Sequence, residues 1–380
     1  MQAEIKVSGI VQGVGFRPFI YRIAVKNGLV GYVRNRGDAL VEIIVKGKKY
    51  NISQFLKDLN REKPPLAQIF NITTDYEKEY ENGFEEFSIK KSSGEAELSG
   101  SVIPPDVSIC DDCLKELRDP KNERFNYFFI TCTNCGPRYS ITYELPYDRL
   151  TTTMRDFQMC DFCSREYRDS SNRRFHSQPV ACPKCGPKAY LASNGGEPME
   201  CDDPIRKAGR LLEEGYIVAI KGNGGFHVAT ATTKAEPIAR LRSVKHRKQK
   251  PFAIMAPELE TVRSFAEVSP WEAKLLTSYR KPIVLLKKRS DYYLSELISP
   301  GLHSVGVMLP YTGLQVMLFD KVKEPAFVMT SANPPSEPIV IGNAEVIKKL
   351  GSTVDYFLLH NRTIAQRCDD SVVRFHGENP

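Results

Sequence analysis

Eight of the ten cysteines fall into four Cys-x-x-Cys pairs, a spacing typical of zinc ligands. The pairs make two copies of the pattern C-x2-C-x18-C-x2-C. Four thiolates complete the tetrahedral coordination of zinc and leave no open position, so we predict two structural Zn²⁺ ions. The predicted ligands are Cys110, Cys113, Cys132 and Cys135 in the first copy, and Cys160, Cys163, Cys182 and Cys185 in the second.

The residues between the pairs are repeated as well. Asp119–Phe125 (DPKNERF) recurs as Asp169–Phe175 (DSSNRRF), and a Gly-Pro dipeptide follows the second pair of each copy. The spacing leaves open whether each zinc takes one repeat or the pairs interleave; we favour one zinc per repeat. The two remaining cysteines, Cys201 and Cys368, are expected to be simple thiols.

Two other uses of Cys-x-x-Cys pairs fit this sequence less well. A redox dithiol needs one pair at a strand-to-helix junction, not four pairs in register. A nucleic-acid-binding finger needs a clustered basic face, which the 18-residue spacers lack.

A glycine-rich turn near the N-terminus, Val11–Arg17 (VQGVGFR), could bind an anion. A turn of this kind directly before a helix presents backbone N–H groups at the positive end of the helix dipole. Arg17 adds a cationic donor suited to phosphate. The plainer interpretation is a tight turn followed by a solvated arginine.

A basic segment, Lys245–Pro251 (KHRKQKP), lies between a predicted helix and a predicted strand. It could offset the charge of a polyphosphate, be a solvated helix end, or contact nucleic acid. His227 and His360 each stand beside an apolar strand, where a lone histidine is usually a satisfied core residue.

The anion loop needs a strand before it and a helix after it, and residues 1–91 supply both. Alternation predicts a strand over 2–9, helical spacing predicts a helix from Arg17 to Asn27, and Gly28 suits its C-terminal end. Further elements are expected as strands at Leu29–Arg34 and Ala39–Val45 around an Asn35–Asp38 turn, a helix with Ser53 as N-cap, and strands near 67–75 and 84–90. The order β-α-β-β-α-β is that of a split βαβ, or ferredoxin-like, sandwich.

The rest of the chain divides into three parts. We expect a polar linker at 92–104, the cysteine region at 105–190, and alternating helices and strands over 200–380. The last part predicts a twisted α/β sheet. The whole is therefore an α+β and α/β multidomain protein.

Composition limits the function classes further. The chain has 380 residues, of which 41% are hydrophobic and 26% charged, with a net charge of +7. No apolar run approaches the roughly 20 residues of a membrane helix, and the N-terminus lacks a basic signal region. Thiol pairs without a secretory signal indicate the reducing cytoplasm.

The anion loop resembles the acylphosphatase signature, and Gly31–Asn35 (GYVRN) resembles that family's second motif. The resemblance implies that the loop and Arg17 hold an acyl phosphate while Asn35 orients the attacking water. The implied phosphate cradle is Gln12, Gly13, Val14, Gly15 and Phe16.

The basic segment resembles the Lys-x-Arg…Lys-Pro signature of the YrdC/Sua5 family, which binds ATP and forms carbamoyl-type adenylates. Ser331–Asn333 (SAN) and Asp369–Arg374 (DDSVVR) match that family in the expected order. The resemblance implies that Lys245, Arg247 and Lys250 contact phosphates. The other implied nucleotide or carbamoyl-adenylate contacts are Ser331, Asn333, Ser371, Arg374 and His227.

An acylphosphatase-like domain, a duplicated four-cysteine zinc region and a YrdC-like domain in this order resemble the HypF family of [NiFe]-hydrogenase maturation carbamoyltransferases. The resemblance implies hydrolysis of carbamoyl phosphate to carbamate, then formation of carbamoyl adenylate from carbamate and ATP with Mg²⁺. The carbamoyl group would pass to the C-terminal cysteine of the partner HypE. That family continues with a Kae1-like domain, whereas this chain stops at Pro380, so we expect an N-terminal fragment that does not complete the transfer alone.

Two alternatives remain. A YrdC/Sua5-like enzyme of tRNA threonylcarbamoyladenosine synthesis would share the adenylate site but needs neither the zinc repeats nor the acylphosphatase-like module. A zinc-dependent nucleic-acid-binding protein would show steeply salt-dependent binding.

Overall fold

The computed structural model describes residues 1–37, 40–76, 83–94, 102–334 and 337–377. The chain forms two compact units, each made of two stretches of sequence. The first contains Met1–Asp106 and Thr131–Cys185, and the second contains Val107–Ile130 and Gly186–Pro380.

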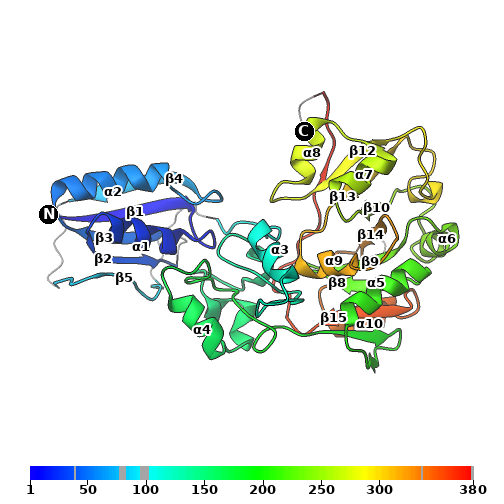
Figure 1. Cartoon of the computed structure of the whole chain (residues 1–380), viewed down its shortest axis with the longest axis horizontal. Helices are drawn as coiled ribbons and strands as arrows, with labels where there is room; N and C mark the ends of the chain where they lie inside the picture. Colours follow the sequence, from blue (N-terminus) through cyan, green and yellow to red (C-terminus); the bar gives the residue numbers. More distant parts are fainter. Residues whose placement is uncertain (38–39, 77–82, 95–101, 335–336, 378–380) are drawn as a thin grey trace. The chain divides into compact units, whose positions relative to one another are not determined.

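The first unit begins with a five-stranded sheet, on which helices α1 and α2 pack side by side (Figure 1). Its strands run in the order β4-β1-β3-β2-β5, with β2 and β5 parallel and the other neighbours antiparallel. The elements are β1 (Gln2–Ile10), α1 (Phe16–Lys26), β2 (Val30–Asn35), β3 (Val41–Lys46), α2 (Lys49–Arg61), β4 (Gln68–Asp75) and β5 (Phe87–Ile89). The predicted β-α-β-β-α-β order is confirmed, and the further strand expected near 84–90 is β5, at the edge of the sheet.

One local prediction in this region is wrong, and part of another lies outside the described residues. Ser53 is not an N-cap, because α2 begins earlier, at Lys49, and Ser53 lies inside it. The apolar stripe of Ile52, Phe55 and Leu59 is buried on one face of α2, and the helix extends one turn before that stripe. Of the predicted turn after β2, Asp38 lies outside the described residues.

The two cysteine repeats fold alike. A short helix starts directly after the first cysteine of each repeat: α3 (Asp111–Arg118) follows Cys110 and α4 (Asp161–Arg168) follows Cys160. Asn126 and His176 hold corresponding positions and share a left-handed backbone, with φ of 55° and 53°. The segment between the repeats folds into three 3-10 turns: η1 (Tyr139–Ile141), η2 (Arg149–Thr151) and η3 (Thr153–Asp156).

The second unit is built on a large mixed sheet in the order β11-β12-β13-β10-β14-β9-β8-β15-β6-β7, with β16 also pairing with β12. The first elements are β6 (Ala189–Ser193), β7 (Pro198–Met199), α5 (Pro204–Glu214), β8 (Val218–Lys221), β9 (Phe226–Ala231), α6 (Ala235–Val244), β10 (Ala253–Met255), α7 (Leu259–Phe265), β11 (Ala266–Glu267) and α8 (Pro270–Leu276). The remaining ones are β12 (Ile283–Lys288), η4 (Glu296–Ile298), β13 (Ser304–Met308), α9 (Gly313–Leu318), β14 (Phe327–Ser331), α10 (Asn343–Leu350), β15 (Tyr356–His360) and β16 (Val372–Val373). The predicted combination of α+β and α/β domains is therefore confirmed.

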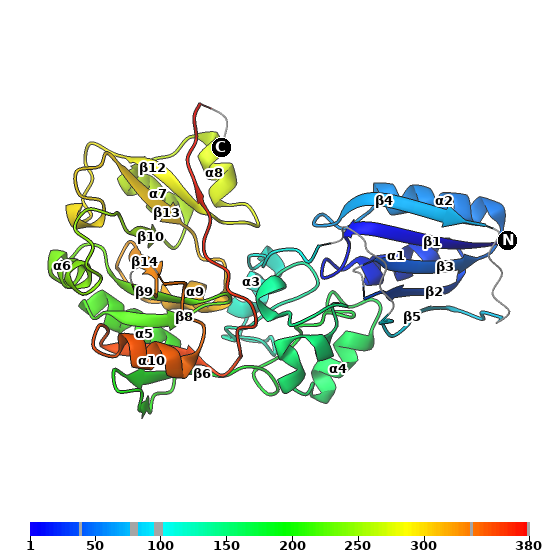
Figure 2. The same ribbon diagram turned by 180° about the vertical axis from the view of Figure 1, so that it is seen from behind.

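The C-terminal segment returns across the sheet of the second unit (Figure 2). Cys368 N–H donates to the Gly224 carbonyl at 3.0 Å, and β16 then runs parallel to β12. This return brings a late part of the sequence to the turn between β8 and β9. In the described part of the chain, none of the helices has the length and apolar character needed to cross a bilayer.

Candidate functional site

The predicted anion loop connects β1 to α1 in a conformation that requires glycine. Gly13 and Gly15 both have a left-handed backbone, with φ of 72° and 74°. Gly15 is the N-cap of α1 and has no side chain to cap the helix, so amides at this end are available to an anion. The side chains of Val14 and Phe16 lie in the hydrophobic core, which leaves their backbone for the cradle.

Arg17 and Asn35 meet beneath this loop. Arg17 lies in the first turn of α1 and Asn35 at the end of β2, and they are 8% and 1% exposed. With its amide oxygen toward the guanidinium, Asn35 accepts hydrogen bonds from Arg17 Nε at 3.3 Å and Nη2 at 3.2 Å. The structure therefore brings together the two residues that the sequence assigns to phosphate and water.

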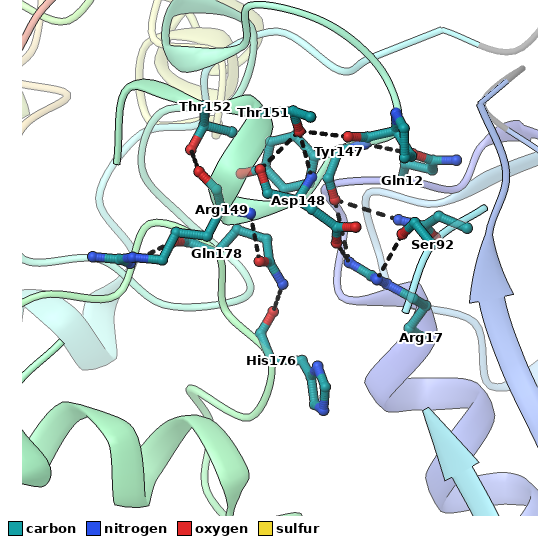
Figure 3. Close-up of polar contacts among 12 residues, drawn as sticks. Gln12, Arg17, Ser92, Tyr147, Asp148, Arg149, Thr151, Thr152, His176 and Gln178 are labelled. Carbon is teal, nitrogen blue, oxygen red and sulfur yellow. Dashed lines mark hydrogen bonds and ion pairs between the residues drawn. The ribbon is translucent and has the colours of Figure 1, made fainter. Parts of the chain in front are cut away.

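The segment between the cysteine repeats holds Arg17 in place (Figure 3). Arg17 Nη2 donates to Asp148 Oδ1 at 2.8 Å and to the Tyr147 carbonyl at 3.2 Å. Gln12 accepts from Tyr147 N–H at 2.9 Å and donates to the carbonyls of Arg36 and Leu40. Gln12 thus lines the pocket, and its side-chain hydrogen bonds fix the neighbouring backbone.

A second buried arginine joins the loop to the first cysteine repeat. Arg138, 1% exposed, donates through Nε to the Gly13 carbonyl. Its other nitrogens donate to the carbonyls of Cys132, Thr133, Cys135 and Pro137 at 2.9 to 3.1 Å. One guanidinium therefore ties a cysteine pair to the anion loop, and both Arg138 and Thr133 line the same pocket as Arg17.

We expect Arg138→Lys to weaken both the fold and phosphate binding. A lysine keeps the charge but cannot satisfy five carbonyls at once, so buried acceptors are left unpaired at a cost of about 2–4 kcal/mol. Thermal unfolding and calorimetric titration with inorganic phosphate measure the two effects. Arg155→Lys is the matched control, because that arginine is half exposed. A variant that matches the control in both measurements would contradict the assignment.

The eight predicted cysteines form two groups of four, one from each repeat. Within each group all four sulfurs lie within 4.8 Å of one another. The Sγ–Sγ distances are 3.7 Å for Cys132–Cys135, 3.6 Å for Cys160–Cys182 and 3.7 Å for Cys163–Cys185. Zinc with four sulfurs at its usual bond length has sulfur–sulfur edges of about 3.8 Å. The donor sets thus fit two structural zinc ions, one per repeat, and the interleaved pairing is excluded.

In the second unit, four of the predicted nucleotide-binding residues share one pocket. Its walls are Lys245, His246, Arg247, Lys248, Lys250, Asn333 and Pro334. Lys245 Nζ donates to the Ser331 carbonyl at 2.9 Å and the Asn333 carbonyl at 3.2 Å. Ser331 Oγ in turn donates to Asn333 Oδ1 at 3.0 Å, so the Ser-Ala-Asn segment and the basic segment form one site.

Positive charge is concentrated in this pocket. Burial, with Arg247 and Lys250 nearby, lowers the pKa of Lys245 to about 8. Perturbed pKa values of this kind cluster at functional sites, and a bound anion would relieve the repulsion among these cations.

The structure places the remaining predicted residues elsewhere in the second unit. Ser371 and Arg374 flank β16 and, as far as the described residues show, do not line this pocket. His227 is 5% exposed on β9, and its Nε2 lies 2.7 Å from Asp370 Oδ2. Burial alone would lower the pKa of His227, but Asp370 outweighs it and raises that pKa.

Sequence reasoning missed several residues that the structure makes conspicuous. At the anion loop these are Arg138, directly after the Gly-Pro of the first cysteine repeat, and Tyr147 and Asp148, in the segment between the repeats. In the second unit the missed residue is Lys221, which is not among the described residues that line the basic pocket. Its Nζ donates to Asn343 Oδ1 at 2.6 Å and to the His360 carbonyl at 3.1 Å. Burial, with Arg362 nearby, lowers the pKa of Lys221 to about 7. The one available signal for Tyr147 and Asp148 was that they lie between the two repeats, in residues 143–158, which match neither copy.

Comparison with protein families gives a match to each part of the chain. Residues 3–89 match the acylphosphatase family, and residues 109–142 and 159–192 match the HypF finger. Residues 210–380 match the Sua5/YciO/YrdC family, described as telomere recombination.

Individual relatives extend these matches. The chain is 53% identical to the probable carbamoyltransferase HypF of Methanocaldococcus jannaschii over 98% of this chain and 48% of that one. The crystal structure of a full-length HypF in its phosphate- and nucleotide-bound form has a TM-score of 0.92 at 44% identity, covering 98% of this chain and 48% of that one. The acylphosphatase of Bacillus licheniformis is 40% identical over 23% of this chain and 97% of its own length.

The fold and the sites thus define a multidomain protein in which an acylphosphatase domain is joined to duplicated four-cysteine fingers and a YrdC-like domain. With this module order and 45–53% identity to HypF proteins over nearly all of its own length, the chain belongs to the HypF family. It spans about half the length of the curated relatives it matches.

Proposed function

We propose that this chain carries the two activation steps of a carbamoyltransferase of [NiFe]-hydrogenase maturation. Carbamoyl phosphate would be hydrolysed to carbamate at the anion loop, and carbamate would react with ATP in the YrdC-like domain. The observation that carries the proposal is the buried Arg17–Asn35 pair beneath a glycine loop at a helix N-terminus.

In the first step, the loop amides and Arg17 would bind the phosphate of carbamoyl phosphate. Asp148 fixes the guanidinium, so little reorganisation is needed when the substrate arrives. Asn35 would orient a water molecule toward phosphorus. The water oxygen bonds to phosphorus, the bond from phosphorus to the carbamoyl oxygen breaks, and carbamate leaves with that electron pair; both water protons end on phosphate.

In the second step, carbamate oxygen would attack the α-phosphorus of ATP, forming carbamoyl adenylate and releasing pyrophosphate. Lys245, Arg247 and Lys250 would offset the triphosphate charge together with Mg²⁺, and Ser331 and Asn333 would contact the nucleotide or acyl group. The proposal also includes contacts to the nucleotide or the carbamoyl adenylate from Ser371, Arg374 and His227. Because carbamate is short-lived in water, transfer between the sites should exclude solvent.

The proposal includes the partners and the organisation of the chain. Two structural zinc ions would hold the finger region, HypE would receive the carbamoyl group from the whole protein, and the reaction would take place in the cytoplasm. The proposed domain limits are 1–91 for acylphosphatase, 92–104 for the linker, 105–190 for the fingers and 200–380 for the YrdC-like domain.

The direct test is phosphate release from carbamoyl phosphate by this chain, followed by carbamoyl adenylate formation when ATP and Mg²⁺ are added. We expect both products. If adenylate forms only with threonine and bicarbonate, the tRNA-modification alternative is favoured and this proposal fails.

We expect ATP affinity to fall as the pH rises through about 8. Lys245 carries its charge below its pKa of about 8 and loses it above that pH, so its contribution to phosphate binding is nearly complete at pH 7 and mostly lost near pH 9. Lys245→Met should weaken binding roughly tenfold at pH 7 and remove this pH-dependent step. Fluorescence titration with an ATP analogue measures both. Lys348→Met, on the exposed face of α10, is the control, and an unchanged pH profile in Lys245→Met would contradict the assignment.

A further inference from the structure

Part of the anion pocket comes from outside the acylphosphatase domain. The pocket is lined by loop residues, by Arg17 and Asn35, and also by Thr133, Arg138, Tyr147, His176, Ser177, Gln178 and Pro179. The Bacillus licheniformis acylphosphatase is covered over 97% of its length by 89 residues of this chain. A free acylphosphatase of that size has no counterpart of residues 176–179, so this wall is an addition.

The added wall is rigidly held. The His176 ring packs against the rings of Tyr167 and Phe175, at centroid distances of 4.8 and 4.7 Å, and Phe175 packs on Tyr21 of α1 at 5.4 Å. Gln178 accepts from Arg149 N–H at 2.9 Å and donates to the His176 carbonyl at 2.7 Å. His176 lines the same pocket as Arg17, and Figure 3 shows these two side chains near each other.

Two polar groups on this wall are suited to a ligand. Ser177 is 3% exposed, and its buried Oγ has no hydrogen-bond partner in the described part of the chain. An unpaired buried hydroxyl is costly unless something that enters the pocket satisfies it. Burial, reinforced by Arg17, lowers the pKa of His176 to about 4 although Asp148 opposes the shift. The imidazole is therefore neutral at pH 7 and has one nitrogen that accepts a hydrogen bond.

We propose that His176 and Ser177, supplied by the second cysteine repeat, bind the –NH2 group of carbamoyl phosphate and make the anion pocket selective for this acyl phosphate. This inference rests on the proposed function and adds which acyl phosphate the pocket selects. The amide –NH2 has two donors, one for each acceptor on the wall. Acetyl phosphate carries a methyl group there, and pockets built for a hydrogen-bonding group reject analogues that lack it.

The test compares kcat/KM for carbamoyl phosphate and acetyl phosphate, measured by phosphate release with the full chain. We expect wild type to prefer carbamoyl phosphate. His176→Ala and Ser177→Ala should each lower kcat/KM for carbamoyl phosphate roughly tenfold or more while changing that for acetyl phosphate less than about threefold. His176→Gln, which keeps an acceptor, should recover part of the loss. Inhibition by inorganic phosphate should be unchanged, since in the proposed binding mode phosphate would contact the loop amides and Arg17 but not this wall.

The possible outcomes distinguish failure of this inference from failure of the proposed hydrolysis. His303→Ala, at an exposed position of the second unit, controls for loss of a histidine and should match wild type. An equal loss for both substrates in the Ala variants, or a wild type without preference, would overturn the specificity role and leave the hydrolysis in place. A wild type that hydrolyses neither substrate would overturn the proposed function and this inference with it.

Discussion

Arg17→Ala is expected to lower hydrolysis of carbamoyl phosphate by about a thousandfold, because it removes the cation placed beneath the phosphate loop. The arginine is 8% exposed, fixed by Asp148 at 2.8 Å and in contact with Asn35, so water cannot replace its preorganised charge. Phosphate release measures the effect. Arg17→Lys should recover little, since a lysine cannot make the same bidentate contact.

The control for this variant lies on the same helix. Lys26→Ala, at the exposed C-terminal end of α1, removes an ion pair with exposed Glu62 and one with Asp58. Asp58 is buried but still accepts hydrogen bonds from Asn27 and Gln54, so the variant should keep full activity. Circular dichroism checks that both variants fold. If the Arg17→Ala variant kept more than a tenth of wild-type activity, phosphate would have to be bound elsewhere.

Cys135→Ser is expected to lower the zinc content from two ions per chain to about one and to abolish carbamoyl phosphate hydrolysis. Closed four-cysteine zinc sites contribute directly to folding, so a lost ligand disorders the repeat around it. Arg138 binds the Cys135 carbonyl and the Gly13 carbonyl with the same guanidinium, so disorder at the first zinc reaches the anion loop. Atomic absorption and phosphate release measure the two effects.

A surface thiol provides the comparison for zinc. Cys201 is exposed and belongs to neither group of four sulfurs, so Cys201→Ser should keep both metal ions and activity. Full activity in Cys135→Ser with one zinc lost would mean that the finger and the loop are independent.

Much of the fold could be predicted because its signals are local. Alternating Ile5 and Val7 mark β1, Gly13 and Gly15 mark the turn, and the helical spacing of Phe19 and Ile23 marks α1. The cysteine repeats specify their own zinc chemistry. These features depend on residues close in sequence, which period and spacing describe well.

The walls of the anion pocket could not be predicted from local signals, because they are made by contacts between residues far apart in the sequence. Asp148 reaches Arg17 across 131 residues, and Arg138 reaches Gly13 across 125. Asp370 reaches His227 across 143 residues in the same way. Nothing in the residue types of the segment between the repeats indicates that it forms a wall of the anion pocket. From the sequence alone, this segment is expected only to connect the two repeats.

The Ser53 error has a different cause. Serine is favoured at helix N-caps, but α2 begins four residues earlier at Lys49, without a side-chain cap. Burial of the apolar face through Ile52 explains why the helix extends beyond the local capping signal.

The central claim is that two sites of one chain act in sequence, and isotope exchange between ATP and pyrophosphate tests it most directly. The exchange is measured on this chain with and without carbamoyl phosphate, for wild type, Arg17→Ala and Asn35→Ala. We predict exchange that depends on carbamoyl phosphate and is lost in both variants, because the adenylate site needs carbamate from the first site. Exchange that ignores carbamoyl phosphate but responds to threonine would contradict the account.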